Sequence, residues 1–139
     1  MRALTICQPY AHLIAIGEKR VENRRWRTSY RGPLVIHAGK SHSWLSGGDS
    51  ERYPDMVFGG IIAIADLAAC WHIEDICDRQ PPPPFAWVAH HAHTEGPWCW
   101  VLPTAEWLDV PLMCSGARGL WIPTPEQVEM LQSQLRAKR

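Results

Sequence analysis

Residues Gly17–Gly32 read GEKRVENRRWRTSYRG, and we expect the rest of the chain to be arranged around this stretch. It holds six basic and two acidic residues, so its local net charge is +4 in a chain whose total is zero. After Gly17, a lysine, a glutamate and an arginine follow in the spacing G-x-K-x-x-E-x-R, with a tryptophan two residues further on. Charge this dense opposes compaction through self-repulsion. A folded domain that keeps it is expected to bind an anionic partner.

The alternation of residue types along Arg20–Arg27 predicts a β-strand. Because side chains in a strand alternate between two faces, one face would combine acid, base and aromatic groups: Arg20, Glu22, Arg24 and Trp26. The alternative is a solvated edge strand whose charges pair with one another and contribute little to stability. Two carboxylates cannot neutralise six cations, which favours the binding interpretation.

The flanking residues predict a scaffold of short elements. A helix is expected to begin with Pro9 at its first helical position and to stop at Gly17, and a C-terminal helix is expected at about 125–137 behind a Thr124 capping box. Residues 39–60 change to a polar composition and are expected to form a long loop or insertion. Phe85–His93 is expected to be helical. The expected strands are Ala3–Cys7, Leu34–Ala38, Ile61–Cys70, Trp98–Leu102, Val110–Leu112 and Gly119–Ile122.

These elements predict the fold class. Short strands spaced along the chain, few helices and twelve prolines indicate an α+β or mainly β fold, a small mixed β-barrel with short flanking helices. Asp66 interrupts the most apolar strand, and a buried carboxylate needs a partner. Its carboxylate either faces the group around Lys19 and Arg24 or caps the end of the strand.

Composition bounds the class of protein. At 139 residues, with 46% hydrophobic and 20% charged residues, the chain suits one domain over residues 1–139. No apolar run is long enough to cross a bilayer, and the N-terminus lacks a signal-peptide pattern, so we expect no membrane partner and a cytoplasmic location. Five unevenly spaced cysteines favour reduced thiols over disulfides.

Cysteine and histidine side chains raise the question of a metal site. Candidate ligands are Cys70, His72, Cys77, His90, His91 and His93. Their spacing matches no recognised zinc pattern, so we expect neither a metal nor a cofactor.

Three motifs follow one another in the first forty residues. They are Leu4-Thr5-Ile6-x-Gln8-Pro9, then Gly17-x-Lys19-x-x-Glu22-x-Arg24-x-Trp26, then Tyr30-Arg31-Gly32-x-Leu34 with Ile36-His37-Ala38. In this order they resemble the ASCH domain family (activating signal cointegrator homology) of the PUA-like superfamily. Later segments match in order and spacing only: Gly60–Asp66 and Gly119-Leu120-Trp121.

The resemblance implies a partly open β-barrel with a cleft between the barrel and the first helix. The family's cleft residues carry over onto Gly17, Lys19, Glu22 and Arg24, with Gln8 and Trp26 nearby. Family members are linked to RNA or DNA binding and to transcription coactivation, which implies a protein partner in a transcription or translation context. Some small bacterial relatives are acetylcytidine amidohydrolases, and one is a ribonuclease. In the amidohydrolases a threonine nucleophile holds the position of Glu22, and a carboxylate there cannot repeat hydroxyl chemistry.

Two hypotheses remain open. The first is a module that binds RNA, another single-stranded nucleic acid or a nucleotide: cations contact phosphates, Trp26 (or Trp44 or Trp98) stacks on a base, and Glu22 or Gln8 reads a base edge. Its residues are Gln8, Lys19, Glu22, Arg24, Arg25, Trp26 and Asp66. The second is a hydrolase acting on RNA or modified nucleosides, in which Lys19 is the base and Glu22 or Asp66 transfers protons.

Overall fold

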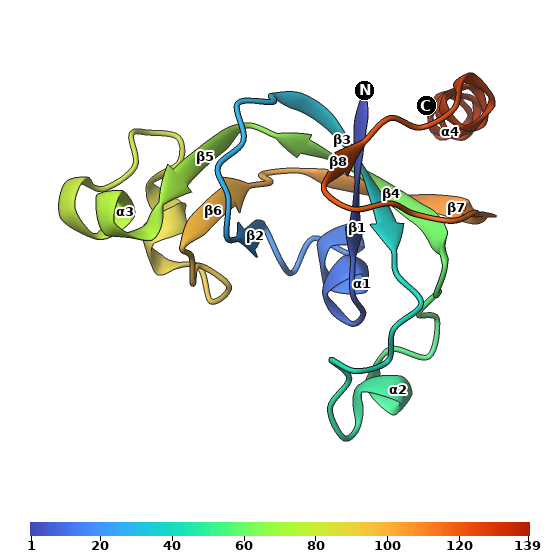
Figure 1. Ribbon diagram of the computed structural model, residues 1–139, viewed down its shortest axis with the longest axis horizontal. Coiled ribbons are helices and arrows are strands. Elements are labelled where there is room, and N and C mark those ends of the chain that lie inside the picture. The colour runs from blue at the N-terminus through green and yellow to red at the C-terminus, as the bar shows by residue number, and fades with distance from the viewer.

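The computed structural model describes residues 1–139 and contains eight strands, four α-helices and one 3₁₀ helix (Figure 1). The strands are β1 Arg2–Ile6, β2 Val21–Arg24, β3 Gly32–Ala38, β4 Gly60–Leu67, β5 Ala69–His72, β6 Trp98–Val101, β7 Ala105–Met113 and β8 Leu120–Trp121. The helices are α1 Tyr10–Ala15, α2 Asp49–Arg52, α3 Ile73–Arg79, the 3₁₀ helix η1 Ala86–His90 and α4 Pro125–Ala137. None of the helices has the length and apolar character that crossing a membrane requires.

The strands form two sheets, a five-stranded sheet in the order β7-β4-β3-β1-β8 and a three-stranded sheet in the order β2-β6-β5. Only β1 and β3 pair in parallel; the other pairs are antiparallel. The two sheets are continuous at one bend. There β4 runs into β5 through Ala68, and β6 runs into β7 through residues 102–104. The Ala68 N–H donates to the Val101 carbonyl and the Asp66 N–H to the Thr104 carbonyl across this bend.

The α+β class expected from the sequence is confirmed, but the strands do not close into a barrel. The expected strand Ile61–Cys70 divides at the bend into β4 and β5. The strand expected over Arg20–Arg27 is shorter, because β2 ends at Arg24 opposite Trp98. The residue before Trp98 is Pro97, which has no N–H to continue the ladder.

The core lies on both faces of the larger sheet. Leu34 and Ile36 in β3 are fully buried and pack in one cluster with Ala11 and Ile14 of α1. Val35, the residue between them, packs on the opposite face in a cluster that includes Leu131 of α4. Strand β3 is apolar without interruption because both of its faces are covered.

The helices differ from expectation in detail. Pro9 is the N-cap of α1 rather than its first residue. Helix α4 has the expected Thr124 capping box, with the Gln127 N–H donating to the Thr124 hydroxyl at 3.1 Å. Phe85–His93 contains only the short η1, and α3 was not anticipated from the acidic stretch before the prolines. The loop at 39–60 carries the single turn α2 (Figure 1).

Candidate functional site

A pocket of about 300 Å³ opens beside β1, α1 and β2. We call it the triad pocket after three charged residues that meet in it, Lys19, Glu22 and Arg24. Its lining comes from segments far apart in the sequence: Thr5, Ile6, Cys7, Tyr10, Lys19, Glu22, Asn23, Arg24, Trp44, His93 and Glu95.

Glu22 lies at the centre of the charged group. Its Oε1 is 3.5 Å from the Lys19 Nζ, and its Oε2 is 2.9 Å from an Nη2 of Arg24. Only 5% of the Lys19 side chain and 9% of the Glu22 side chain are exposed. Charges buried to this degree persist only when they are paired, so the three side chains form one unit.

The local chain path explains why Lys19 reaches Glu22. Gly17, two residues after the end of helix α1, lies in the left-handed region at φ +83°, a conformation that glycine adopts at little cost. The N–H groups of Glu18 and Lys19 both donate to the Leu13 carbonyl, which satisfies an open acceptor at the helix end. The tight turn places the Lys19 ammonium 5.4 Å from the centre of the Tyr10 ring, beside the start of β2.

Arg24 connects the triad to β1 and retains an unused donor. An Nη2 donates to the Thr5 carbonyl at 3.1 Å as well as to Glu22. The Nε of Arg24 is buried and has no hydrogen-bond partner. A buried donor without an acceptor costs about 1–3 kcal/mol, so the residues around Arg24 leave one of its polar groups unsatisfied.

The charge of the pocket differs from the cationic cleft predicted by sequence. Two cations, Lys19 and Arg24, face two carboxylates, Glu22 and Glu95. His93, which also lines the pocket, has its pKa lowered, mainly by burial and further by Lys19, against opposing effects of nearby carboxylates. The net charge of the lining is therefore close to zero near pH 7. The negative charges of Glu22 and of Glu95, which comes from a distant segment, offset the positive charges of Lys19 and Arg24.

The aromatic wall comes from Tyr10 and Trp44, whose rings meet edge to face with centroids 6.4 Å apart. Trp44 is 60% exposed and can offer a ring face to a ligand. Trp26, the expected stacking residue, does not line the pocket. Its ring packs edge-on against the buried Trp100 at 4.7 Å, since the chain leaves β2 after Arg24.

The other expected site residues lie outside the pocket. Gln8 is fully buried; it donates to the Val57 carbonyl at 2.8 Å and accepts from the His12 N–H at 2.8 Å, so it ties α1 to the long loop. Asp66 is exposed in β4 opposite Pro33 and makes no ion pair with the triad, so of the two alternatives for its carboxylate the one that faces Lys19 and Arg24 has no contact to support it. Arg25 is exposed just beyond the end of β2.

Arg20, expected on the same strand face as Glu22, points away from the pocket. Its guanidinium lies 4.0 Å from the centre of the Trp87 ring and donates to the Pro103 carbonyl. The backbone N–H of Arg20 donates to the His91 Nε2 at 2.9 Å. The pKa of His91 is lowered by burial and then by His93 and Arg20, which keeps this nitrogen available as an acceptor.

Sequence reasoning did not place Tyr10, Asn23, His93 or Glu95 in this site. Asn23 brings the last two to the pocket: its amide donates to the His93 carbonyl at 2.8 Å, and its oxygen accepts from the N–H groups of Glu95 and Gly96. The only available signal was the asparagine within a strand, a residue that hydrogen-bonds backbone groups of neighbouring loops. Nothing in the sequence identifies which loop it holds.

No group of three or more histidine, cysteine or acidic side chains is placed to bind a metal ion. Two of the candidate histidines have other partners: the His91 Nε2 accepts from the Arg20 N–H, and the His72 ring meets Trp98 edge to face at 5.0 Å. All five cysteines are free thiols. Burial raises the pKa of Cys99 to about 11, so this thiol is protonated at neutral pH.

Comparison with known proteins identifies the family. The family model described as the ASCH domain matches residues 4–100, which include the whole basic motif. The chain therefore belongs to the ASCH domain family. A search of the curated proteins gives no match.

Solved structures show the same fold. The crystal structure of ASCH from Zymomonas mobilis is 14% identical, with a TM-score of 0.58 over 95% of this chain and 93% of that one. A tyrosine-to-phenylalanine mutant of that protein gives a TM-score of 0.58 at 14% identity, covering 95% of this chain and 96% of that one. A serine-to-alanine mutant gives 0.57 at 15% identity, covering 95% and 94%. At this identity the likeness concerns the fold alone.

Proposed function

We propose that this protein is a nucleic-acid-binding module that holds an unpaired base or nucleotide of RNA, or of single-stranded DNA, in the triad pocket. The ASCH domain is a PUA-like family of the RNA-binding type. The observation that carries the proposal is the buried Lys19–Glu22–Arg24 unit at the base of an open pocket, with the Arg24 Nε left without an acceptor.

The lining suits a base more than a bare phosphate. A near-neutral set of donors and acceptors can pair with a base edge, which offers both, whereas a phosphate offers acceptors only. Trp44 supplies the ring on which a base can stack, a contact worth about 1–3 kcal/mol. Phosphate contacts fall to the exposed cations that follow β2, Arg25 and Arg27.

The test is fluorescence anisotropy with a labelled single-stranded RNA at several salt concentrations. We expect affinity to fall steeply with salt, because exposed arginines displace counterions from phosphates. Arg24→Lys removes the Nε donor and the planar fork and is expected to weaken binding about tenfold or more. Lys40→Met, which removes an exposed lysine outside the pocket, is the control. Absence of binding, indifference to salt, or equal affinity of the Arg24→Lys variant would overturn the proposal.

A second candidate is a hydrolase that acts on RNA or modified nucleosides. It is favoured by the placement of Lys19 beside a carboxylate and by His93, a neutral imidazole that lines the same pocket and can accept a proton. Lys19 and Glu22 would be its catalytic residues. Turnover of acylated nucleosides or short RNAs, lost in Lys19→Ala and Glu22→Ala, would support it; turnover unaffected by either change removes it.

A further inference from the structure

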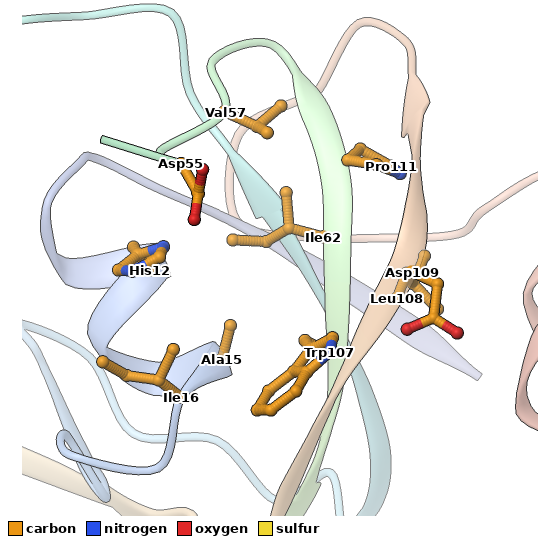
Figure 2. Close-up of a pocket in the computed structure, with 10 residues that line it drawn as sticks. All are labelled: His12, Ala15, Ile16, Asp55, Val57, Ile62, Trp107, Leu108, Asp109 and Pro111. Carbon is orange, nitrogen blue, oxygen red and sulfur yellow. The ribbon is translucent and has the colours of Figure 1, made fainter. Parts of the chain in front are cut away.

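A second and larger pocket, of about 600 Å³, lies on the other side of α1. Figure 2 shows it between α1, the long loop and strands β4 and β7. Its lining is His12, Ala15, Ile16, Asp55, Val57, Ile62, Trp107, Leu108, Asp109 and Pro111. It shares no residue with the triad pocket, and the basic motif contributes nothing to it.

The pocket exists because strand β7 bulges away from β4. Ile61 pairs with Leu112 and Ala63 pairs with Trp107, so the single residue Ile62 lies opposite four residues, Leu108–Pro111. The extra residues bend β7 outward and leave Ile62 at the back of the opening (Figure 2). Bulges of this kind re-aim side chains and occur often beside binding sites. We therefore call this cavity the bulge pocket.

Helix α4 holds the bulge in place. The Gln134 side chain pairs with both backbone groups of Val110: its oxygen accepts from the N–H at 3.1 Å and its amide donates to the carbonyl at 2.7 Å. Lys138 donates to the Trp107 carbonyl and lies 3.6 Å from an oxygen of Asp109. These hydrogen bonds satisfy backbone groups of β7 that are not paired with β4 in the bulge. The bulge, and with it the pocket, is therefore stabilised by the rest of the fold.

The walls of the bulge pocket are apolar and one of them is aromatic. The Trp107 side chain is 53% exposed, and its ring extends along the opening toward Ile16 (Figure 2). A half-exposed tryptophan beside a concave apolar wall provides a face for a flat or aliphatic group. A volume of this size is in the range of pockets that bind small organic molecules.

A carboxylate on an exposed residue of the long loop, Asp55, lines the pocket where solvent reaches it. Asp55 directs its carboxyl group toward the middle of the pocket, whereas the Asp109 carboxyl points outward, where Lys138 pairs with it (Figure 2). Asp55 takes part in none of the ion pairs of the structure. The nearest basic group is His12, and burial lowers its pKa, although Asp55 and Glu18 oppose this effect. At neutral pH the imidazole is uncharged, so the charge of Asp55 is not balanced from within the pocket.

We infer that the bulge pocket is a second ligand site, which takes an organic cation: an amine attached to a flat apolar body. The ammonium group pairs with Asp55, and the body packs between Trp107 and Ile16 over Ile62. A cation beside the indole face also gains from cation–π attraction. An anionic ligand is excluded by the same carboxylate, which distinguishes this site from one that binds nucleic acid.

The experiment uses naphthylmethylamine as the probe and naphthylmethanol as its uncharged counterpart of equal shape. Both are titrated into ¹⁵N-labelled protein while the indole and backbone resonances are recorded at pH 7.5. We expect the amine to shift the Trp107 indole N–H and the backbone of Ile62, and to bind about fivefold more tightly than the alcohol. Binding that is equal for the two probes, or shifts confined to other residues, would overturn the inference.

Variants separate the charge from the shape of the pocket. Asp55→Asn keeps the size of an exposed loop side chain and is expected to remove the advantage of the amine over the alcohol. The matched control is Asp66→Asn, because Asp66 is also an exposed aspartate but lines neither pocket. This variant should retain the advantage of the amine. If the amine keeps its advantage in Asp55→Asn, Asp55 is not its partner and the inference fails.

Discussion

Helix α1 contributes to two pockets of different character. On one side Tyr10 joins the triad pocket, where the buried Glu22 carboxylate is paired with both Lys19 and Arg24. On the other side His12 and Ala15 join the bulge pocket, which is twice as large, mainly apolar, and holds one unpaired carboxylate. The triad pocket depends on charged side chains that are close in sequence, Lys19, Glu22 and Arg24. The bulge pocket depends on the path of the β7 backbone. The two should respond differently to substitution.

The largest difference is expected in stability. Glu22→Ala leaves the buried Lys19 ammonium without its carboxylate, and breaking a buried pair costs about 3–5 kcal/mol. Glu129→Ala is a matched control, because Glu129 and Arg136 are also 3.5 Å apart but are 71% and 63% exposed. The control should lose less than about 1 kcal/mol. Urea unfolding measures both; equal losses would contradict the view that the triad is one buried unit.

The next effect concerns the aromatic wall of the triad pocket. Trp44→Ala is expected to weaken binding of single-stranded RNA by about 1–3 kcal/mol, because it removes the exposed ring that can stack on a base. Trp26→Ala should leave the dissociation constant unchanged, since Trp26 packs on Trp100 outside the pocket. Anisotropy titrations compare the two. If only Trp26→Ala weakened RNA binding, Trp26 rather than Trp44 would be the residue that stacks on a base, as the sequence first suggested.

A smaller effect is expected at the bulge. Gln134→Ala removes two hydrogen bonds to Val110, but both bonds are exposed to solvent and water can replace them. We expect a loss of about 1 kcal/mol in unfolding free energy together with weaker binding of naphthylmethylamine. Affinity for RNA should not change. Loss of RNA affinity in this variant would show that the two pockets are not independent.

The smallest effect is the pH dependence that the two pockets share. Burial lowers the pKa of His12 in one pocket and of His93 in the other below the ordinary value of 6.5. The unfolded chain then binds more protons than the folded protein, so stability is lost progressively as the pH falls from about 6.5 toward the lowered pKa values. Thermal unfolding at several pH values should show this decline. His12→Gln and His93→Gln should each flatten it, and an unchanged profile in both would refute the assignment.

The contrast explains what the sequence could predict. The triad pocket is anchored by Gly17, Lys19, Glu22 and Arg24, which are neighbours in the chain, so a turn followed by a strand suffices to bring three charges together. The same holds for the buried strand β3 and for the Thr124 capping box, both of which depend on local pattern. Local rules therefore predicted which charges meet and most of the elements around them.

The remainder depends on contacts between distant segments. Asn23 selects the loop that carries His93 and Glu95, and this choice made the pocket nearly neutral where the motif alone predicted positive charge. Trp26 left the pocket because Pro97 ends the neighbouring ladder. The bulge pocket has no sequence signal at all, since it arises from a shift in pairing between β4 and β7 that α4 stabilises.

The central claim is that the triad pocket, and not the bulge pocket, holds the nucleic acid. The direct measurement is the set of ¹⁵N resonances shifted when a short single-stranded RNA is added to labelled protein. We predict shifts at the backbone of Tyr10, of Glu22–Arg24 and of His93, and at the Trp44 indole, with the Trp107 indole and Ile62 unmoved. Shifts at Trp107 and Ile62, with Glu22–Arg24 unmoved, would contradict the claim.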